Sequence, residues 1–137
     1  MIQRMDHFTI VTDQLGSTIG FYERLGLAVG ARPDFGVGGA WLYVGDHPVL
    51  HVVETGRMPE PRRGVLDHMA FFAQDFVALA ARVSEAGIAY RVIRTPRPFS
   101  LWQMFLYDPN GVEVELDFAP DETPPADWKS FAGLGAR

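Results

Sequence analysis

Residues of metal-binding type recur at matched points of an internal repeat. Residues 5–8 read Met-Asp-His-Phe and residues 66–69 read Leu-Asp-His-Met, so each copy carries a histidine close to its start. Farther along, His51 and Glu115 each follow the tyrosine of a Leu-Tyr pair by eight residues. Imidazole nitrogen and carboxylate oxygen both bind divalent transition metals. The repeat therefore predicts a metal site that draws on His7, His51, His68 and Glu115.

Each of these residues, taken singly, has a simpler interpretation. A single histidine on a strand is usually a hydrogen-bonded or half-exposed side chain, but the matched spacing favours ligation for the set. Other polar residues nearby are not expected to bind the metal. His47 lies in an expected turn and Glu54 on the opposite face of its strand, while Glu113 and Asp117 are expected at the rim or facing solvent.

The hydrophobic pattern of each copy predicts a strand, a helix and then short strands, which is a βαβββ module. Gly26 and Gly87 are placed to end the two helices in left-handed caps. Turn-forming residues at 45–48 and 108–111 predict hairpins. Among the expected elements are strands 5–12, 40–44, 49–54, 66–73, 103–107 and 112–118 and helices 15–25 and 75–86. The sequence thus predicts an α+β fold of two βαβββ modules.

The two modules are expected to form one domain over residues 1–137. The first module covers about residues 2–54, a connector rich in Pro, Arg and Gly covers 55–65, and the second module covers about 66–118. The tail, residues 119–137, has no counterpart in the first module. Its aromatic residues Trp128 and Phe131 predict packing over the domain or over a partner subunit, with a loose tail as the alternative.

Strand alternation decides whether the candidate ligands can face one another. On the first strand His7 shares a face with Thr9, while the neighbouring apolar residues face the helix. On later strands His51 lies opposite the buried valine and leucine positions, and Glu115 shares its face with two other acids. We therefore expect all four candidate ligands on the sheet faces that the helices leave uncovered.

The composition limits the classes of partner and of chemistry. At 137 residues, with 47% hydrophobic and 21% charged residues, the chain is typical of one soluble globular domain. Its net charge of −5 disfavours nucleic acid as a partner, and it has no long apolar run that predicts a membrane span. It has no cysteine, so thiolate ligands and nucleophiles are excluded. Without an N-terminal signal-type segment, the expected location is cytoplasmic.

Several of these motifs together resemble the vicinal oxygen chelate superfamily, the group of glyoxalases, bleomycin-resistance proteins and extradiol dioxygenases. The resemblance covers about residues 2–118. It rests on the two Asp-His strand starts, on the helix endings at residues 22–27 and 83–88, and most specifically on the closing motif at residues 107–116, Tyr-Asp-Pro-Asn-Gly-Val-Glu-Val-Glu-Leu. In that family paired modules form a cup around a divalent metal. The resemblance implies the same ligands, His7, His51, His68 and Glu115, with Zn, Ni, Mn or Fe(II) as the metal.

The resemblance leaves the reaction open. One hypothesis is a lyase or isomerase whose metal is chelated by two neighbouring oxygens of a small substrate and stabilises a developing enolate charge, with Glu115 doubling as the base. A second is an Fe(II) extradiol dioxygenase that uses His7, His68 and Glu115, with His51 as an acid/base group. A third is a binder without catalysis, like the bleomycin-resistance proteins, although the retained ligand set argues against it.

Two further expectations concern the surroundings of the metal. Aromatic, cationic and amide side chains in residues 91–103 could cap the cup and contact the substrate, with an exposed loop as the alternative. The candidates are Arg94, Arg97, Trp102 and Gln103. The resemblance also implies a homodimer in which the first module of one chain completes the cup with the second module of its partner, with a monomer whose two modules pair within the chain as the alternative.

Overall fold

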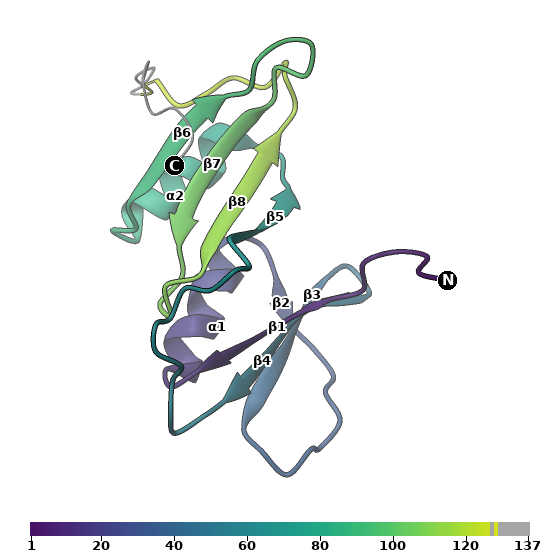
Figure 1. The fold of residues 1–137 in the computed structure, drawn as a ribbon. Coiled ribbons are helices and arrows are strands. Elements are labelled where there is room, and N and C mark those ends of the chain that lie inside the picture. The colour runs from purple at the N-terminus through teal and green to yellow at the C-terminus, as the bar shows by residue number, and fades with distance from the viewer. Residues whose placement is uncertain (127, 129–137) are drawn as a thin grey trace. The chain divides into compact units, whose positions relative to one another are not determined.

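The structure is a computed structural model that describes residues 1–126 and 128, and its chain divides into two compact units (Figure 1). Unit 1 comprises Met1–Asp67 together with Asp108–Val112. Unit 2 comprises His68–Tyr107 and the described residues from Glu113 onward. The boundary at Asp67 and His68 agrees with the boundary expected between connector and second module, but the turn at 108–112 belongs with unit 1.

Unit 1 is a four-stranded sheet with one helix against it. Its elements are β1 (Phe8–Thr12), α1 (Leu15–Arg24), β2 (Ala28–Val29), β3 (Gly39–Val44) and β4 (His47–Glu54). The strand order is β1-β4-β3-β2, with β1 parallel to β4 and the other pairs antiparallel. Helix α1 contacts β2, β3 and β4 along one face of this sheet (Figure 1).

Unit 2 repeats the same plan. Its elements are β5 (His68–Phe72), α2 (Phe76–Glu85), β6 (Tyr90–Arg94), β7 (Trp102–Tyr107) and β8 (Glu113–Phe118). The order is β5-β8-β7-β6, again with the first strand parallel to the last. The predicted α+β fold of two βαβββ modules is confirmed. Neither helix of the described residues has the length and apolar character needed to cross a membrane.

Alternation along the strands separates a buried face from an open face in each sheet. In β1, Ile10 and Thr12 are buried while Thr9 and Val11 are exposed. Along β4 and β8 the buried apolar side chains occupy alternate positions in the same way. Phe76 of α2 stacks on Phe118 of β8, with ring centroids 4.1 Å apart, so the apolar face of the second sheet is the helix side.

Both helices end as the glycines predict. Gly26 has φ +102° and Gly87 has φ +69°, values that a residue with a Cβ atom rarely adopts. The backbone N–H after each glycine donates to the carbonyl five residues earlier, at Tyr22 and at Val83. This hydrogen-bonded cap turns the chain sharply back toward the next strand.

The first hairpin is tighter than expected. Strand β3 ends at Val44 and β4 begins at His47, so the turn contains only Gly45 and Asp46. His47 is therefore the first residue of a strand and not a turn residue as predicted. Its Nε2 lies 2.8 Å from the carbonyl oxygen of Asp6.

The described part of the tail packs on unit 2. Trp128 meets Trp102 edge-on, with ring centroids 4.7 Å apart. The carboxylate of Glu122 accepts a hydrogen bond from the first backbone N–H of α2, at Phe76, and so takes the place of a cap residue within the helix. Packing over the domain is thus observed as far as Trp128, whereas Phe131 lies outside the described residues.

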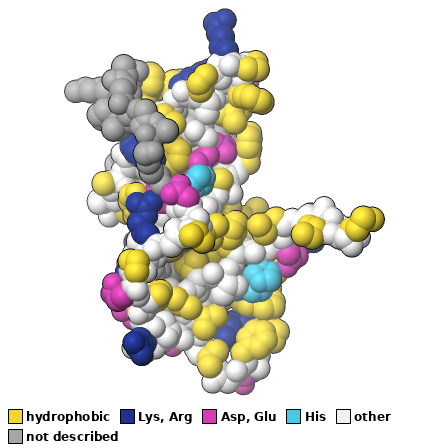
Figure 2. Space-filling model, in the orientation of Figure 1, with side chains coloured by type: hydrophobic (Ala, Val, Ile, Leu, Met, Phe, Trp, Pro, Cys, Tyr) yellow, Lys and Arg dark blue, Asp and Glu magenta, His cyan; other side chains and the backbone are white. Residues whose placement is uncertain are grey.

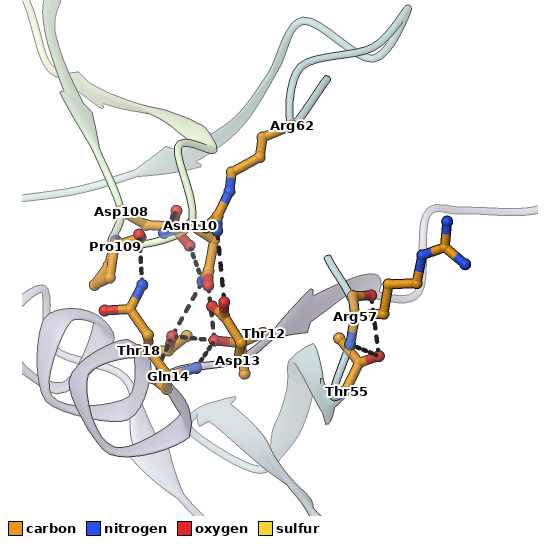
Figure 3. Close-up of polar contacts among 10 residues, drawn as sticks. All are labelled: Thr12, Asp13, Gln14, Thr18, Thr55, Arg57, Arg62, Asp108, Pro109 and Asn110. Atoms are coloured by element: carbon orange, nitrogen blue, oxygen red, sulfur yellow. Dashed lines mark hydrogen bonds and ion pairs between the residues drawn. The ribbon is translucent and has the colours of Figure 1, made fainter. Parts of the chain in front are cut away.

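A buried polar network holds the turn at Asp108–Val112 within unit 1 (Figure 3). The side chain of Asn110 accepts a hydrogen bond from Thr12 at 2.7 Å and donates one to Thr18 at 3.0 Å. The Asp108 carboxylate accepts from the backbone N–H groups of Asn110 and Val112. It also accepts from the hydroxyl of Tyr22, whose pKa is raised by burial and by this carboxylate. The closing motif of the sequence therefore has a structural role in unit 1.

Replacement of Asn110 by Ala should destabilise the protein by about 2 kcal/mol, because it removes the buried side-chain hydrogen bonds of Asn110 with Thr12, Thr18 and Asp108. The matched control is Gln14→Ala, which removes an exposed hydrogen bond to the same turn, at Pro109, and should cost less than about 1 kcal/mol. Urea unfolding of both variants measures the difference. Equal losses of stability would contradict a structural role for the buried network.

Candidate metal centre

Two of the four candidate ligands stack on one another in unit 1. His51 lies in β4 opposite Thr9 of β1, and His7 immediately precedes β1. The two imidazole rings have centroids 3.7 Å apart and planes 20° apart. The indole of Trp41, the cross-strand neighbour of His51, stacks at 4.0 Å and 5°. The rings of His7 and Trp41 cannot both stack on the same face of the His51 ring, so His51 is held between them.

This packing leaves one ligand-type atom of His51 without a partner. Its Nε2 is buried and forms no hydrogen bond within the described residues. Burial lowers the pKa of His51, and the nearby His7 and Arg32 add to the effect. The imidazole is therefore neutral at pH 7, the form in which histidine binds a metal.

A carboxylate orients the imidazole of His7, the other candidate ligand of unit 1. His7 Nδ1 lies 2.8 Å from Oδ2 of Asp6, and this hydrogen bond is the main cause of the lowered pKa of Asp6. When Nδ1 carries the proton, Nε2 of His7 is the atom left to bind a metal. Hydrogen bonds of this kind fix the tautomer and ring orientation of metal-binding histidines.

The other two candidates meet in unit 2. His68 Nε2 lies 3.1 Å from Oε2 of Glu115. The other oxygen of Glu115 accepts a hydrogen bond from the amide of Gln103, which also donates to Asp117. Burial raises the pKa of Glu115, and the adjacent Asp117 carboxylate adds to this effect. The two candidate ligand atoms of unit 2 thus lie next to one another on the open face of the sheet.

Glu113 is not at the rim, as the sequence analysis expected. It is 1% exposed, lies 2.9 Å from the guanidinium of Arg91 and accepts a hydrogen bond from the hydroxyl of Tyr107. Arg91 in turn lies over the ring of Phe105, 3.8 Å from its centroid. Burying a carboxylate costs free energy unless it is paired and hydrogen-bonded. The ion pair with Arg91 and the hydrogen bond from Tyr107 therefore give Glu113 a structural role.

The four predicted substrate contacts fall in different places. Trp102 is 6% exposed and packs against Phe76 of α2, and Arg94 lies over the Trp102 ring. Both side chains therefore lie on the helix-covered face of the second sheet, whereas Gln103, the next residue of β7 after Trp102, points to the opposite face. Arg97 is exposed between β6 and β7. Gln103 alone lies beside a candidate ligand, Glu115.

Three residues near the candidate ligands were not assigned a role from the sequence. Trp41 was not predictable from the turn length, because a two-residue turn alone would place it opposite Leu50, and a register shift between Leu42 and Val44 brings it opposite His51. Asp6 was visible in the Asp-His motif but was not recognised as a hydrogen-bond partner. Arg32 lies in an irregular loop, and no spacing in the sequence signals its position.

The donor set fits a divalent metal. Within residues 1–126 and 128, no three His, Asp or Glu side chains come together closely enough to hold a metal ion. Each unit by itself carries two of the four candidates, and histidine side chains are visible on the surface of both units (Figure 2). Three imidazoles and one carboxylate suit Zn, Ni, Mn or Fe(II), and the unpartnered Nε2 of His51 is the feature that a metal would satisfy.

Comparisons with known proteins place the chain in a family. Residues 4–116 match the model of the Glyoxalase/Bleomycin resistance protein/Dioxygenase superfamily, and the chain belongs to this superfamily. The resemblance stated from the sequence is thereby confirmed. A search of curated proteins gives no match.

Solved structures of similar fold include several glyoxalase family proteins. One from Bacillus anthracis has a TM-score of 0.70 and 21% identity, covering 87% of this chain and 97% of its own. One from Enterococcus faecalis has a TM-score of 0.65 and 25% identity, covering 84% and 97%. The fosfomycin resistance protein FosX from Listeria monocytogenes has a TM-score of 0.68 and 16% identity, covering 87% and 95%. These likenesses establish the fold.

The pKa of His51 should lie below its ordinary value of 6.5, and stability should fall as the pH drops from 6.5 through that lowered pKa. The sign follows because the folded state resists protonation of a buried imidazole more than the unfolded state does. Replacement of Trp41 by Leu should raise the pKa toward 6.5 by admitting water. Histidine NMR titration measures both values, and an unshifted or raised pKa in the parent protein would contradict this account.

Proposed function

We propose that this protein is a divalent-metal-dependent enzyme, a lyase or isomerase that acts on a small substrate with two neighbouring oxygens. The observation that carries the proposal is the buried, unpartnered Nε2 of His51 beside His7. A buried polar atom without a hydrogen bond costs free energy, so a native protein keeps one where it serves a function. The His68 and Glu115 pair supplies the complementary donors.

The metal, when bound, would act as a Lewis acid that stabilises negative charge developing on the substrate oxygens. The protein would hold it with His7, His51, His68 and Glu115. Asp6 would fix the His7 ring through Nδ1, and Gln103 would leave one oxygen of Glu115 available. A carboxyl group whose pKa is raised is also suited to accept and return a proton, which supports Glu115 as the base.

We further propose that the working form is a homodimer with two shared sites. Neither unit alone has more than two of the four ligands, and a catalytic metal of this type usually takes at least three protein ligands. His7 and His51 of one chain would be completed by His68 and Glu115 of the partner. A twofold axis would then generate two equivalent sites from one self-complementary surface.

The second candidate function is an Fe(II) dioxygenase. It would use a face of two histidines and one carboxylate, His7, His68 and Glu115, and leave His51 as an acid/base group. The unpartnered Nε2 of His51 is able to accept a proton as well as to bind a metal. Metal analysis of protein purified without chelator favours the dioxygenase if it finds iron, and the lyase or isomerase if it finds zinc or nickel.

Replacement of any one ligand should weaken metal binding severely, because each removes one donor from a four-donor set. We expect one metal per chain in the parent, and loss of stoichiometric binding in His7→Ala, His51→Ala, His68→Ala and Glu115→Gln. His47→Ala is the matched control, a histidine on the surface of the same unit that should keep full binding. Calorimetric titration of each variant with Zn(II) or Co(II) measures the metal affinities.

The pattern of losses separates the alternatives. Full metal binding by both His68→Ala and Glu115→Gln would overturn the metal site. Full binding by His51→Ala alone would assign His51 the acid/base role, for which a loss of turnover of roughly 10²- to 10⁴-fold is typical.

Mixing two inactive variants tests the shared site without a substrate. His7→Ala and Glu115→Gln chains should each bind no metal as homodimers. Their heterodimer should bind one metal per dimer, because one of its two sites has all four ligands intact. Native mass spectrometry after subunit exchange counts the metal, and a heterodimer that forms but stays empty would refute the shared arrangement.

A further inference from the structure

One cation is fixed beside the ligand pair of unit 1. Arg32 is half-buried in the loop between β2 and β3. Its guanidinium lies over the ring of Phe35, 5.1 Å from the centroid, and donates a hydrogen bond to the carbonyl of Val37 at 3.0 Å. These two contacts hold the charged group in one place on an otherwise exposed loop.

The Arg32 guanidinium lies beside the stacked rings that hold His51. A Cβ atom built on Gly39 would lie 3.3 Å from Nη2 of Arg32. The ring of Phe35, over which the guanidinium lies, is 6.0 Å from the ring of Trp41, and Trp41 stacks on His51.

Arg32 differs from Arg91, the corresponding cation on the open face of unit 2. Arg91 is neutralised by the buried Glu113 carboxylate. Arg32 forms no ion pair within the part of the chain that the structure describes, and its single hydrogen bond there uses one of five N–H donors.

An unneutralised cation beside two metal ligands has a cost, because it repels the metal by Coulomb's law. A role limited to closing the loop would not require a charge, since Val37 offers a neutral carbonyl that any donor could satisfy. The charge becomes favourable when the occupant of the site brings a negative group of its own. The guanidinium fork suits a carboxylate or phosphate, which accept two parallel hydrogen bonds.

We propose that Arg32 binds an anionic group of the substrate, so that the substrate class is a small carboxylate or phosphate that also offers oxygens to the metal. This inference rests on the proposed metal-dependent function. It adds a specificity-determining residue from a loop that carries no candidate ligand.

The experiment measures the binding of oxalate and of inorganic phosphate to the Zn(II)-loaded protein by calorimetry. We expect Arg32→Gln to bind Zn(II) at least as tightly as the parent, because a repelling charge is gone, and to bind at least one anion roughly tenfold or more weakly, because a charge-assisted hydrogen bond is lost. Arg32→Lys should fall between parent and Gln, since it keeps the charge without the fork. The anion that is more strongly affected identifies the group that Arg32 recognises.

The control is Arg62→Gln, which removes a different arginine of unit 1, one that is paired with Asp13. It should leave both anion affinities unchanged. Equal anion binding by parent and Arg32→Gln, an equal loss in Arg62→Gln, or a Zn(II)-loaded parent that binds neither anion would overturn the inference. A parent that binds no Zn(II), Co(II), Ni(II), Mn(II) or Fe(II) would overturn the proposed function, and this inference with it.

Discussion

The parallel pairing of the first strand with the last strand of each unit is the constraint on which the candidate site depends. It places Thr9 opposite His51 in unit 1 and Ala70 opposite Glu115 in unit 2, at the same point of the repeat. Because side chains alternate, a slip of one residue would turn a candidate ligand toward the helix and an apolar side chain toward water. Burial of the apolar face against α1 and α2 therefore also determines the face on which the candidate ligands lie.

The two units use the same positions for different chemistry. In unit 1 the last-strand position is an imidazole held between two rings, with a fixed cation nearby. In unit 2 it is a carboxylate among other acids, held by the amide of Gln103. In the proposed shared site, the carboxylate would attract the divalent cation and the fixed guanidinium would attract an anionic substrate. Two unlike halves would then give one site both affinities.

The repeat in the sequence was sufficient to predict the elements, their faces and the pairing of candidate ligands within each unit. Its limit appears at Glu113, where alternation predicts the face but not that Arg91 and Tyr107 cover the carboxylate. A similar limit applies to Arg94 and Trp102, which lie on the helix-covered face of the second sheet. Residues 91–103 were treated as one capping stretch, whereas two strands divide them between opposite faces.

Contacts between residues far apart in sequence were beyond prediction for a different reason. Asn110 and Thr12 are 98 residues apart and form a hydrogen bond, and no pattern in the sequence around either residue predicts this contact. The motif at residues 107–116 was recognised as the most specific part of the resemblance, and the structure gives its aspartate and asparagine a buried structural role. Specificity of a motif therefore did not by itself indicate chemistry.

The most direct test of the central claim is a crystal structure of the metal-loaded protein with anomalous scattering recorded at the absorption edge of the metal. The account predicts one anomalous peak per chain, bound by Nε2 of His7 and of His51 from one chain and by His68 and Glu115 of its partner. A peak elsewhere, or the absence of any peak at saturating metal, would contradict it.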